Sequence, residues 1–128
     1  MAPPLTGAPL VAFVGTSDLE QAQRFYGDTL GLRLVDTTAF ANVYDCDGTT
    51  LRVTRVERVV PAGYTALGWS VAGIRTVMDE LAGRDVVFER FSGVEQDDAG
   101  VWTTPDGTRV AWFRDPDGNT LSLSERPS

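Results

Sequence analysis

The side chains that carry most enzyme chemistry are scarce in this sequence. The chain has no histidine and a single cysteine, Cys46. Without histidine there can be no Ser-His-Asp arrangement and no imidazole to activate Cys46 as a nucleophile. A lone cysteine also excludes an internal disulfide and a thiolate metal cluster. Acid–base catalysis by a buried carboxylate stays open, because pKa tuning by burial leaves no trace in a sequence.

Charge and composition restrict the classes of partner. The 128 residues suit a single domain with one core, and the net charge is −7, from 18 acidic and 11 basic residues. This balance argues against nucleic acid, which needs a basic face. It would suit a cationic ligand, or it is simply that of an acidic soluble protein. No apolar run is long enough for a membrane helix, and the start "MAPPLTGAP" lacks signal-peptide features, so we expect a cytoplasmic protein with no membrane partner.

Hydrophobic periodicity divides residues 9–60 into a strand, a helix and three more strands. Ser17 and Glu20 have capping-box spacing and predict the start of the helix, and Gly31 lies where a helix-ending glycine belongs. Asp47-Gly48 predicts a tight hairpin turn. The strands are expected at residues 9–15, 32–38, 40–46 and 49–56.

A strand and a helix recur in residues 64–125, followed here by four strand-like stretches. A helical stripe runs from Ile74 to Ala82, and Gly83 ends it. Asp117-Gly118 takes the place that Asp47-Gly48 has in the first half. Strands are expected at residues 64–71, 86–90, 100–104, 108–115 and 119–125.

This order predicts an α+β fold of two tandem β-α-β-β-β units, 9–60 and 64–125, in one domain spanning residues 1–128, with a loose tail at 1–8. Each unit would carry its helix on one sheet face, and the opposite faces would form a curved mixed sheet around a trough. Alternation along the last strand directs Leu121 and Leu123 to the helix and Ser122 to the trough.

Two segments resemble the vicinal oxygen chelate superfamily of glyoxalase I, bleomycin resistance proteins and extradiol dioxygenases. They are "SDLEQAQRFYGDTLGLRLV" (17–35), with its Phe-Tyr pair and Leu-Gly-Leu exit, and "WFRDPDGNTLSLSE" (112–125), with its closing turn and last strand. The resemblance implies the paired-unit fold and a homodimer, in which a partner often completes the open edges. It does not fix the function, because this fold hosts very different chemistries.

Enzymes of that superfamily usually hold a divalent metal in the trough on His and Glu or Gln. The resemblance places the ligand positions at Val11, Arg52, Ala66 and Ser122. None of the four is a competent ligand, and Arg52 would repel a cation. Glu125 lies beyond the last position with opposite strand parity, and we do not expect it to bind metal. We therefore predict no metal and no cofactor.

Four residues of the second unit are candidates for contact with a ligand. Trp102 and Trp112 could stack on a flat molecule, and Tyr64 could donate a hydrogen bond from the rim. Ser122 would offer a small neutral hydroxyl in place of a metal ligand. Trp69 shares parity with the apolar strand positions around it, so we place it in the core under the second helix.

Two candidates belong to the first unit. Phe13 should line the trough or fill it. Arg52, on the trough face of its strand, needs an anionic partner when half-buried. That partner is a ligand carboxylate or phosphate or, as we favour, a nearby Asp or Glu.

We therefore predict metal-independent binding of a small, partly aromatic or cationic molecule, of the bleomycin-resistance type, with antibiotic sequestration as one form. The main alternative is an enzyme of the same superfamily, a lyase, isomerase or dioxygenase. It would use a metal on unrecognised carboxylates or metal-free acid–base catalysis. A third reading is an interaction module whose trough is filled by its own side chains.

Overall fold

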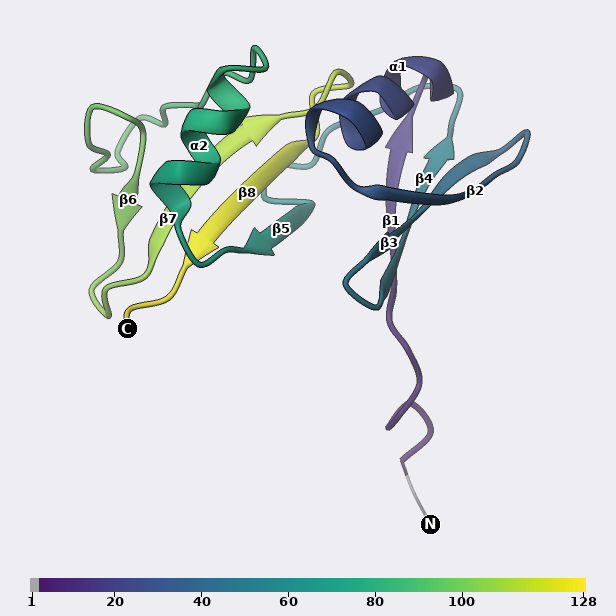
Figure 1. The fold of residues 1–128 in the computed structure, drawn as a ribbon, viewed down its shortest axis with the longest axis horizontal. Coiled ribbons are helices and arrows are strands. Elements are labelled where there is room, and N and C mark those ends of the chain that lie inside the picture. The colour runs from purple at the N-terminus through teal and green to yellow at the C-terminus, as the bar shows by residue number, and fades with distance from the viewer. Residues whose placement is uncertain (1–2) are drawn as a thin grey trace. The chain divides into compact units, whose positions relative to one another are not determined.

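The computed structural model describes residues 3–128, and these form two compact units with the same element order. The first unit ends at Arg58, and the second begins at Val59 (Figure 1). The first contains β1 (Val11–Thr16), α1 (Leu19–Gln23), the π-helix η1 (Arg24–Thr29), β2 (Arg33–Thr37), β3 (Ala41–Cys46) and β4 (Thr49–Arg55). The second contains β5 (Leu67–Ser70), α2 (Ile74–Ala82), β6 (Trp102–Thr103), β7 (Arg109–Arg114) and β8 (Thr120–Glu125).

The two sheets have the same topology. The strand order is β1-β4-β3-β2 in the first unit and β5-β8-β7-β6 in the second. In each sheet the first strand pairs in parallel with the last, and the other pairs are antiparallel. The predicted α+β fold of two tandem β-α-β-β-β units is therefore confirmed.

Alternation along the last strand of each unit decides what is buried. In β4, Leu51 and Val53 are buried, whereas Arg52 between them is only half-buried. In β8, Leu121 and Leu123 are buried in the same way. In Figure 1, α2 lies across one face of the sheet that contains β7 and β8. Each unit therefore has a helix-covered face and an opposite face, called the open face below.

The first helix begins one residue later than predicted. Asp18 is its N-cap, and the Asp18 carboxylate accepts a 3.1 Å hydrogen bond from the Gln21 backbone nitrogen. The predicted N-cap at Ser17 is therefore wrong, because the neighbouring carboxylate takes that role. The helix continues as η1 and then gives way to Gly31, whose φ of +77° confirms the predicted glycine at the exit.

A tyrosine of the π-helix takes part in an aromatic contact in the first core. Tyr26 of η1 and Tyr44 of β3 are both fully buried, with ring centroids 6.2 Å apart. A Cβ at Gly27 would lie 3.9 Å from the Tyr44 ring. Burial raises the pKa of the Tyr44 phenol above its usual value.

Both predicted aspartate–glycine turns are confirmed. Asp47 and Gly48 have φ values of +49° and +93°, as the tightest hairpin turns require. In the second unit Gly118 has φ +89°, and the buried Asp115 carboxylate accepts hydrogen bonds from the Asp117 and Asn119 backbone nitrogens. This turn is therefore held by hydrogen bonds within its own segment.

The strands of the second unit are shorter than predicted. The strand expected at 64–71 begins at Leu67, and the one expected at 100–104 is reduced to Trp102–Thr103. The predicted strand at 86–90 is wrong: this segment makes one isolated bridge, Phe88 to Phe113. The Glu89 backbone nitrogen donates to the Trp112 carbonyl of β7 at 2.7 Å, whereas the Glu89 carbonyl accepts from the Gln96 side chain.

The predicted tail covers residues 1–8, of which 1–2 lie outside the described residues. Residues 3–8 are exposed and belong to neither a helix nor a strand. No helix within residues 3–128 is long and apolar enough to cross a membrane.

Candidate ligand-binding site

The open face of the second sheet carries a row of three registered residues. Gly68 of β5 pairs with Ser122 of β8, and Ser122 pairs with Trp112 of β7. Trp69 pairs with Leu123 and so lies on the opposite, helix-covered face, but it is half-buried there and not part of the buried core in which we placed it. Trp112 and Ser122, two of the predicted ligand contacts, are therefore neighbours on one surface.

Aromatic rings gather around Trp112. The Trp102 ring stacks on it, with centroids 6.0 Å apart and planes 21° apart. The edge of Phe91 meets it from another side, at a centroid distance of 5.3 Å and an interplanar angle of 86°. Offset-stacked and edge-to-face contacts are the favoured geometries for aromatic pairs. All three side chains are half-buried, so part of this cluster stays accessible.

A pocket of about 290 Å³ opens beside Trp112. Aromatic side chains, small hydroxyl side chains and one glycine line it, and none of them carries a charge at neutral pH. They are Gly63, Tyr64, Thr65, Phe91, Trp112 and Thr120. Tyr64 is 75% exposed and lies in the loop before β5, not in the strand expected from residue 64. The volume is at the lower end of the range for small-molecule sites, and the lining suits a compact aromatic group.

Ser122 is held close to the backbone of the neighbouring strand. A Cβ added at Gly68 would lie 2.6 Å from the Ser122 Oγ, closer than real Cβ contacts. The absence of a side chain at Gly68 therefore leaves the space that the Ser122 hydroxyl occupies.

The loop between α2 and β6 supplies the Phe91 wall. At the surface of this loop, outside the pocket lining, the Asp97 carboxylate lies 2.6 Å from the Arg75 guanidinium of α2. The hydrogen bond from Arg75, with a further one from the Val101 backbone nitrogen, lowers the Asp97 pKa to about 2. The Asp97 carboxyl is therefore charged at neutral pH, but the pair is exposed to solvent and adds little to the position of the loop.

The two candidates in the first unit lie side by side. Phe13 of β1 pairs with Arg52 of β4 on the open face of the first sheet. Phe13 is 63% exposed. We expected an internal ion pair for Arg52, but no carboxylate within residues 3–128 lies within ion-pair distance of it. The internal ion pair that we favoured is therefore not found there, and a contact of Arg52 with a ligand anion stays a prediction.

The residues at the expected metal positions do not fit a divalent cation. Two of the expected metal positions, Val11 and Ala66, do not pair with Arg52 and Ser122. The strand register instead pairs Arg52 with Phe13 and Ser122 with Gly68. Neither phenylalanine nor glycine offers a ligand atom in its side chain. Across the described part of the chain, no three His, Cys, Asp or Glu residues are grouped to hold a metal ion.

The sequence predicted some residues of this candidate site and did not predict others. Alternation along the strands pointed to Trp112 and Ser122, and these do share a surface. Phe91 and Thr65 were missed because they lie in loops, where no periodicity marks an inward side chain. The turn-rich stretch before Thr65 was the one available signal of a loop at the sheet edge.

Comparison with known proteins identifies the fold family. The family model of the glyoxalase/bleomycin resistance protein/dioxygenase superfamily matches residues 9–123. A superfamily member from Sphaerobacter thermophilus DSM 20745 is 27% identical, with a TM-score of 0.71 over 92% of this chain and 96% of that chain. Lactoylglutathione lyase from Agrobacterium tumefaciens is 18% identical, with a TM-score of 0.70 over 96% and 95%. TioX from Micromonospora sp. ML1 is 15% identical, with a TM-score of 0.69 over 94% and 100%.

Among curated proteins, none matches this chain. The last two structures share the fold at identities too low to carry more than the fold. The family model, in contrast, spans nearly the whole chain. This chain therefore belongs to the glyoxalase/bleomycin resistance protein/dioxygenase superfamily.

Proposed function

We propose that this protein binds a small molecule with a compact aromatic portion, without a metal ion and without chemical conversion. The observation that carries the proposal is the pocket beside Trp112, which is lined by three aromatic side chains and by no charged one. An apolar, partly preformed concavity with a few hydroxyl groups is typical of a small-molecule site.

The donor set supports binding over metal chemistry. A divalent cation in a protein needs imidazole, carboxylate or thiolate ligands. The rows that contain Arg52 and Ser122 offer a guanidinium, a hydroxyl and apolar groups instead. The lyase, isomerase and dioxygenase alternatives would each need a further group that these residues do not supply.

Charge supports a ligand that is neutral or cationic near the aromatic pocket. The chain has a net charge of −7, which attracts cations to its surface and slows the approach of anions. The faces of tryptophan and tyrosine also attract cations. Sequestration of an aromatic or cationic antibiotic, as in bleomycin-type resistance, is the form of this function that we propose.

Tryptophan fluorescence tests the proposal directly. Bleomycin-type and other aromatic drugs are titrated into the wild type and into two matched variants, Trp112→Phe and Trp69→Phe. We expect saturable quenching in the wild type and in Trp69→Phe, because Trp69 lies on the helix-covered face. In Trp112→Phe most of the quenching should be lost. Truncation to Trp112→Ala should weaken binding about ten-fold, measured by calorimetry, because an aromatic contact is removed.

A ligand that binds the native state must also raise the melting temperature. A broad panel that neither quenches the emission nor raises the melting temperature would contradict the proposal. Equal quenching of Trp112→Phe and the wild type would remove the pocket beside Trp112 as the site.

A further inference from the structure

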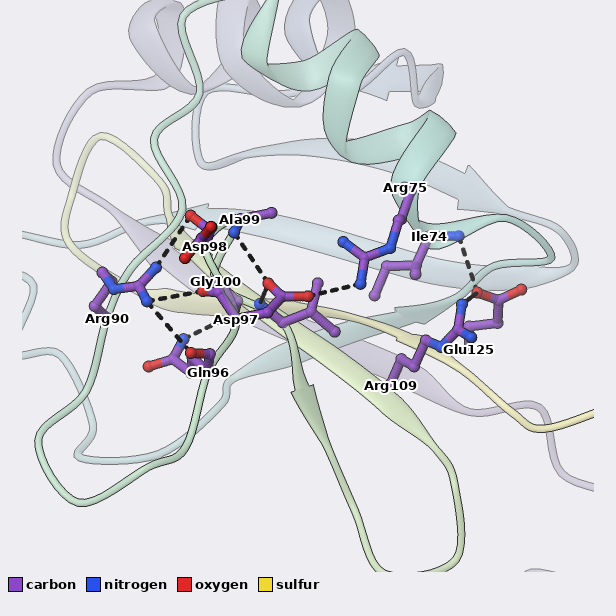
Figure 2. Close-up of polar contacts among 11 residues, drawn as sticks. Ile74, Arg75, Arg90, Gln96, Asp97, Asp98, Ala99, Gly100, Arg109 and Glu125 are labelled. Atoms are coloured by element: carbon purple, nitrogen blue, oxygen red, sulfur yellow. Dashed lines mark hydrogen bonds and ion pairs between the residues drawn. The ribbon is translucent and has the colours of Figure 1, made fainter.

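The segment 89–101 is held by side-chain contacts to its own backbone (Figure 2). The Gln96 amide is central to them. Its Oε1 accepts a hydrogen bond of 2.8 Å from the Phe91 backbone nitrogen. Its Nε2 donates to the carbonyls of Glu89 and Gly100, at 2.9 and 2.7 Å. One side chain thus joins the outgoing and returning arms of the loop.

Gln96 also connects the two aromatic neighbours of Trp112. Its side chain bonds to the backbone of Phe91, and its main chain forms an isolated antiparallel bridge with Trp102. Phe91 and Trp102 both contact the Trp112 ring, at centroid distances of 5.3 and 6.0 Å. The four residues are therefore connected by a closed ring of contacts. A displacement of Gln96 would displace the Phe91 and Trp102 side chains together.

Neighbouring contacts fix the rest of the loop. The Arg90 guanidinium donates to the carbonyl of Asp97 at 2.7 Å. The Asp97 carboxylate accepts from the Ala99 and Val101 backbone nitrogens, both at 3.0 Å. Gly100 is buried with φ +100°, a conformation that side chains rarely adopt. The wall of the pocket is therefore built before any ligand arrives.

The chemistry at Gln96 requires a primary amide. One backbone N–H and two backbone carbonyls face its end, which calls for one acceptor and two donors. A carboxylate of the same length could satisfy the N–H, but it would turn oxygen lone pairs toward the two carbonyls. Alanine would leave all three groups without this partner in a half-buried position.

We infer that Gln96 is a positioning residue that sets which aromatic ring systems the pocket accepts. It holds Phe91, which lines the pocket with Trp112, and Trp102, which stacks on Trp112, and so fixes the width of the pocket. The inference rests on the proposed binding function. A pocket whose width is fixed before binding spares the ligand the free-energy cost of ordering the loop. Only an aromatic ring of matching size binds more tightly for this reason.

The test compares Gln96→Ala and Gln96→Glu with a matched control, Arg75→Gln. The control removes the exposed contact of Asp97 with the helix and leaves the Gln96 hydrogen bonds in place. The probes are indole, with two fused rings, and acridine, with three. Calorimetry gives the ratio of their dissociation constants for each protein. We expect Gln96→Ala to change this ratio about ten-fold in favour of acridine, and Arg75→Gln to leave it unchanged.

Two spectroscopic readouts separate positioning from a general loss of stability. The near-ultraviolet circular dichroism of the Trp102–Trp112 pair should weaken in folded Gln96→Ala and persist in Arg75→Gln. In Gln96→Glu the signal and the ratio should move toward wild type as the pH falls, because a protonated carboxyl can donate to one of the two carbonyls. The wild type measured over the same pH range is the reference.

The outcomes are distinguishable. If the wild type binds neither probe nor any drug of the panel, the proposed function fails and this inference fails with it. If the wild type binds and Gln96→Ala keeps both the ratio and the dichroism, only the inference about Gln96 is overturned. Should Gln96→Ala not fold, Gln96→Glu at neutral and acid pH decides: a ratio and a dichroism that do not change with pH overturn the inference.

Discussion

The carboxylate of Glu125, at the end of β8, accepts a hydrogen bond of 3.3 Å from the backbone nitrogen of Ile74, the first residue of α2 (Figure 2). The N-cap residue of this helix is Gly73, which has no side chain to cap with. Glu125 also lies 3.8 Å from the Arg109 guanidinium. A neighbouring strand thus supplies the acceptor and the negative charge that the start of a helix favours.

The first prediction concerns this cap. Glu125→Ala should lower the free energy of unfolding by about 1 kcal/mol, the usual cost of a lost N-cap. Glu125→Gln should cost less, because its amide oxygen can still accept from the Ile74 nitrogen. Urea denaturation of the three proteins measures the difference. Ligand affinity should not change in either variant, and a loss of affinity in folded Glu125→Gln would show that this carboxylate does more than cap the helix.

The alternation of apolar residues along the strands and the turn residues predicted most of the fold. Leu121 and Leu123 were placed under the second helix by strand parity alone, and both are buried. The turns at Asp47-Gly48 and Asp117-Gly118 were recognisable because few residues other than glycine adopt positive φ readily. These signals are local, so a single sequence contains them in full.

The missed features depend on contacts between distant residues. The segment 86–90 has the apolar residues of a strand, but it makes one isolated bridge to β7, and its Glu89 carbonyl accepts from the Gln96 side chain. The N-cap of α1 was assigned to Ser17 because serine and aspartate are equally good caps by type, and the geometry selects Asp18. The place of Phe91 in the pocket follows from the same loop contacts, which no periodicity encodes.

The second prediction is a pH dependence at Asp97. Its pKa in the folded protein is about 2, below the ordinary value of 3.8, because Arg75 and the Val101 nitrogen favour the charged form. A lowered folded-state pKa gives stability that is complete above the unfolded value and is lost as the pH falls through the folded one. Asp97→Asn should therefore be less stable than the wild type at pH 7, and the gap should close as the pH falls from about 4 toward 2.

The size of this gap should be below about 1 kcal/mol, since the Arg75 and Asp97 side chains are 54% and 40% exposed and solvent screens the pair. Urea denaturation of both proteins at a series of pH values measures it. The Asp97 carboxyl can also be titrated by NMR. A gap that stays constant down to pH 2, or a carboxyl that titrates near 3.8, would contradict the assignment.

The third prediction concerns the close approach of Gly68 and Ser122. Gly68→Ala should cost about 1 kcal/mol, because the new Cβ would lie 2.6 Å from the Ser122 Oγ and must displace it. In a Ser122→Ala background the cost should nearly vanish, and a double-mutant cycle on the free energy of unfolding gives the coupling. Gly63→Ala is the matched control, since a Cβ there meets nothing within 4 Å. Additive effects of Gly68→Ala and Ser122→Ala would mean that the two residues are not in contact.

The last prediction concerns metal ions. The rows at Arg52 and Ser122 lack metal-ligand side chains, and within residues 3–128 no other grouping of suitable residues replaces them. Protein purified without chelator should therefore contain no stoichiometric transition metal by elemental analysis. Added Zn²⁺, Ni²⁺, Mn²⁺ or Fe²⁺ should leave the melting temperature unchanged, whereas an ion that binds the native state would raise it in a saturable way.

Arg52→Glu gives this prediction a sharper form. The substitution puts a carboxylate where a guanidinium now repels cations, on the same face as Thr50 and Thr54 of β4. One carboxylate without imidazole or thiolate neighbours is a weak site, so the variant should gain at most a small, unsaturated thermal shift with Zn²⁺. A saturable shift in the wild type would show that carboxylates elsewhere in the chain hold a cation. Binding without a metal would then have to be abandoned.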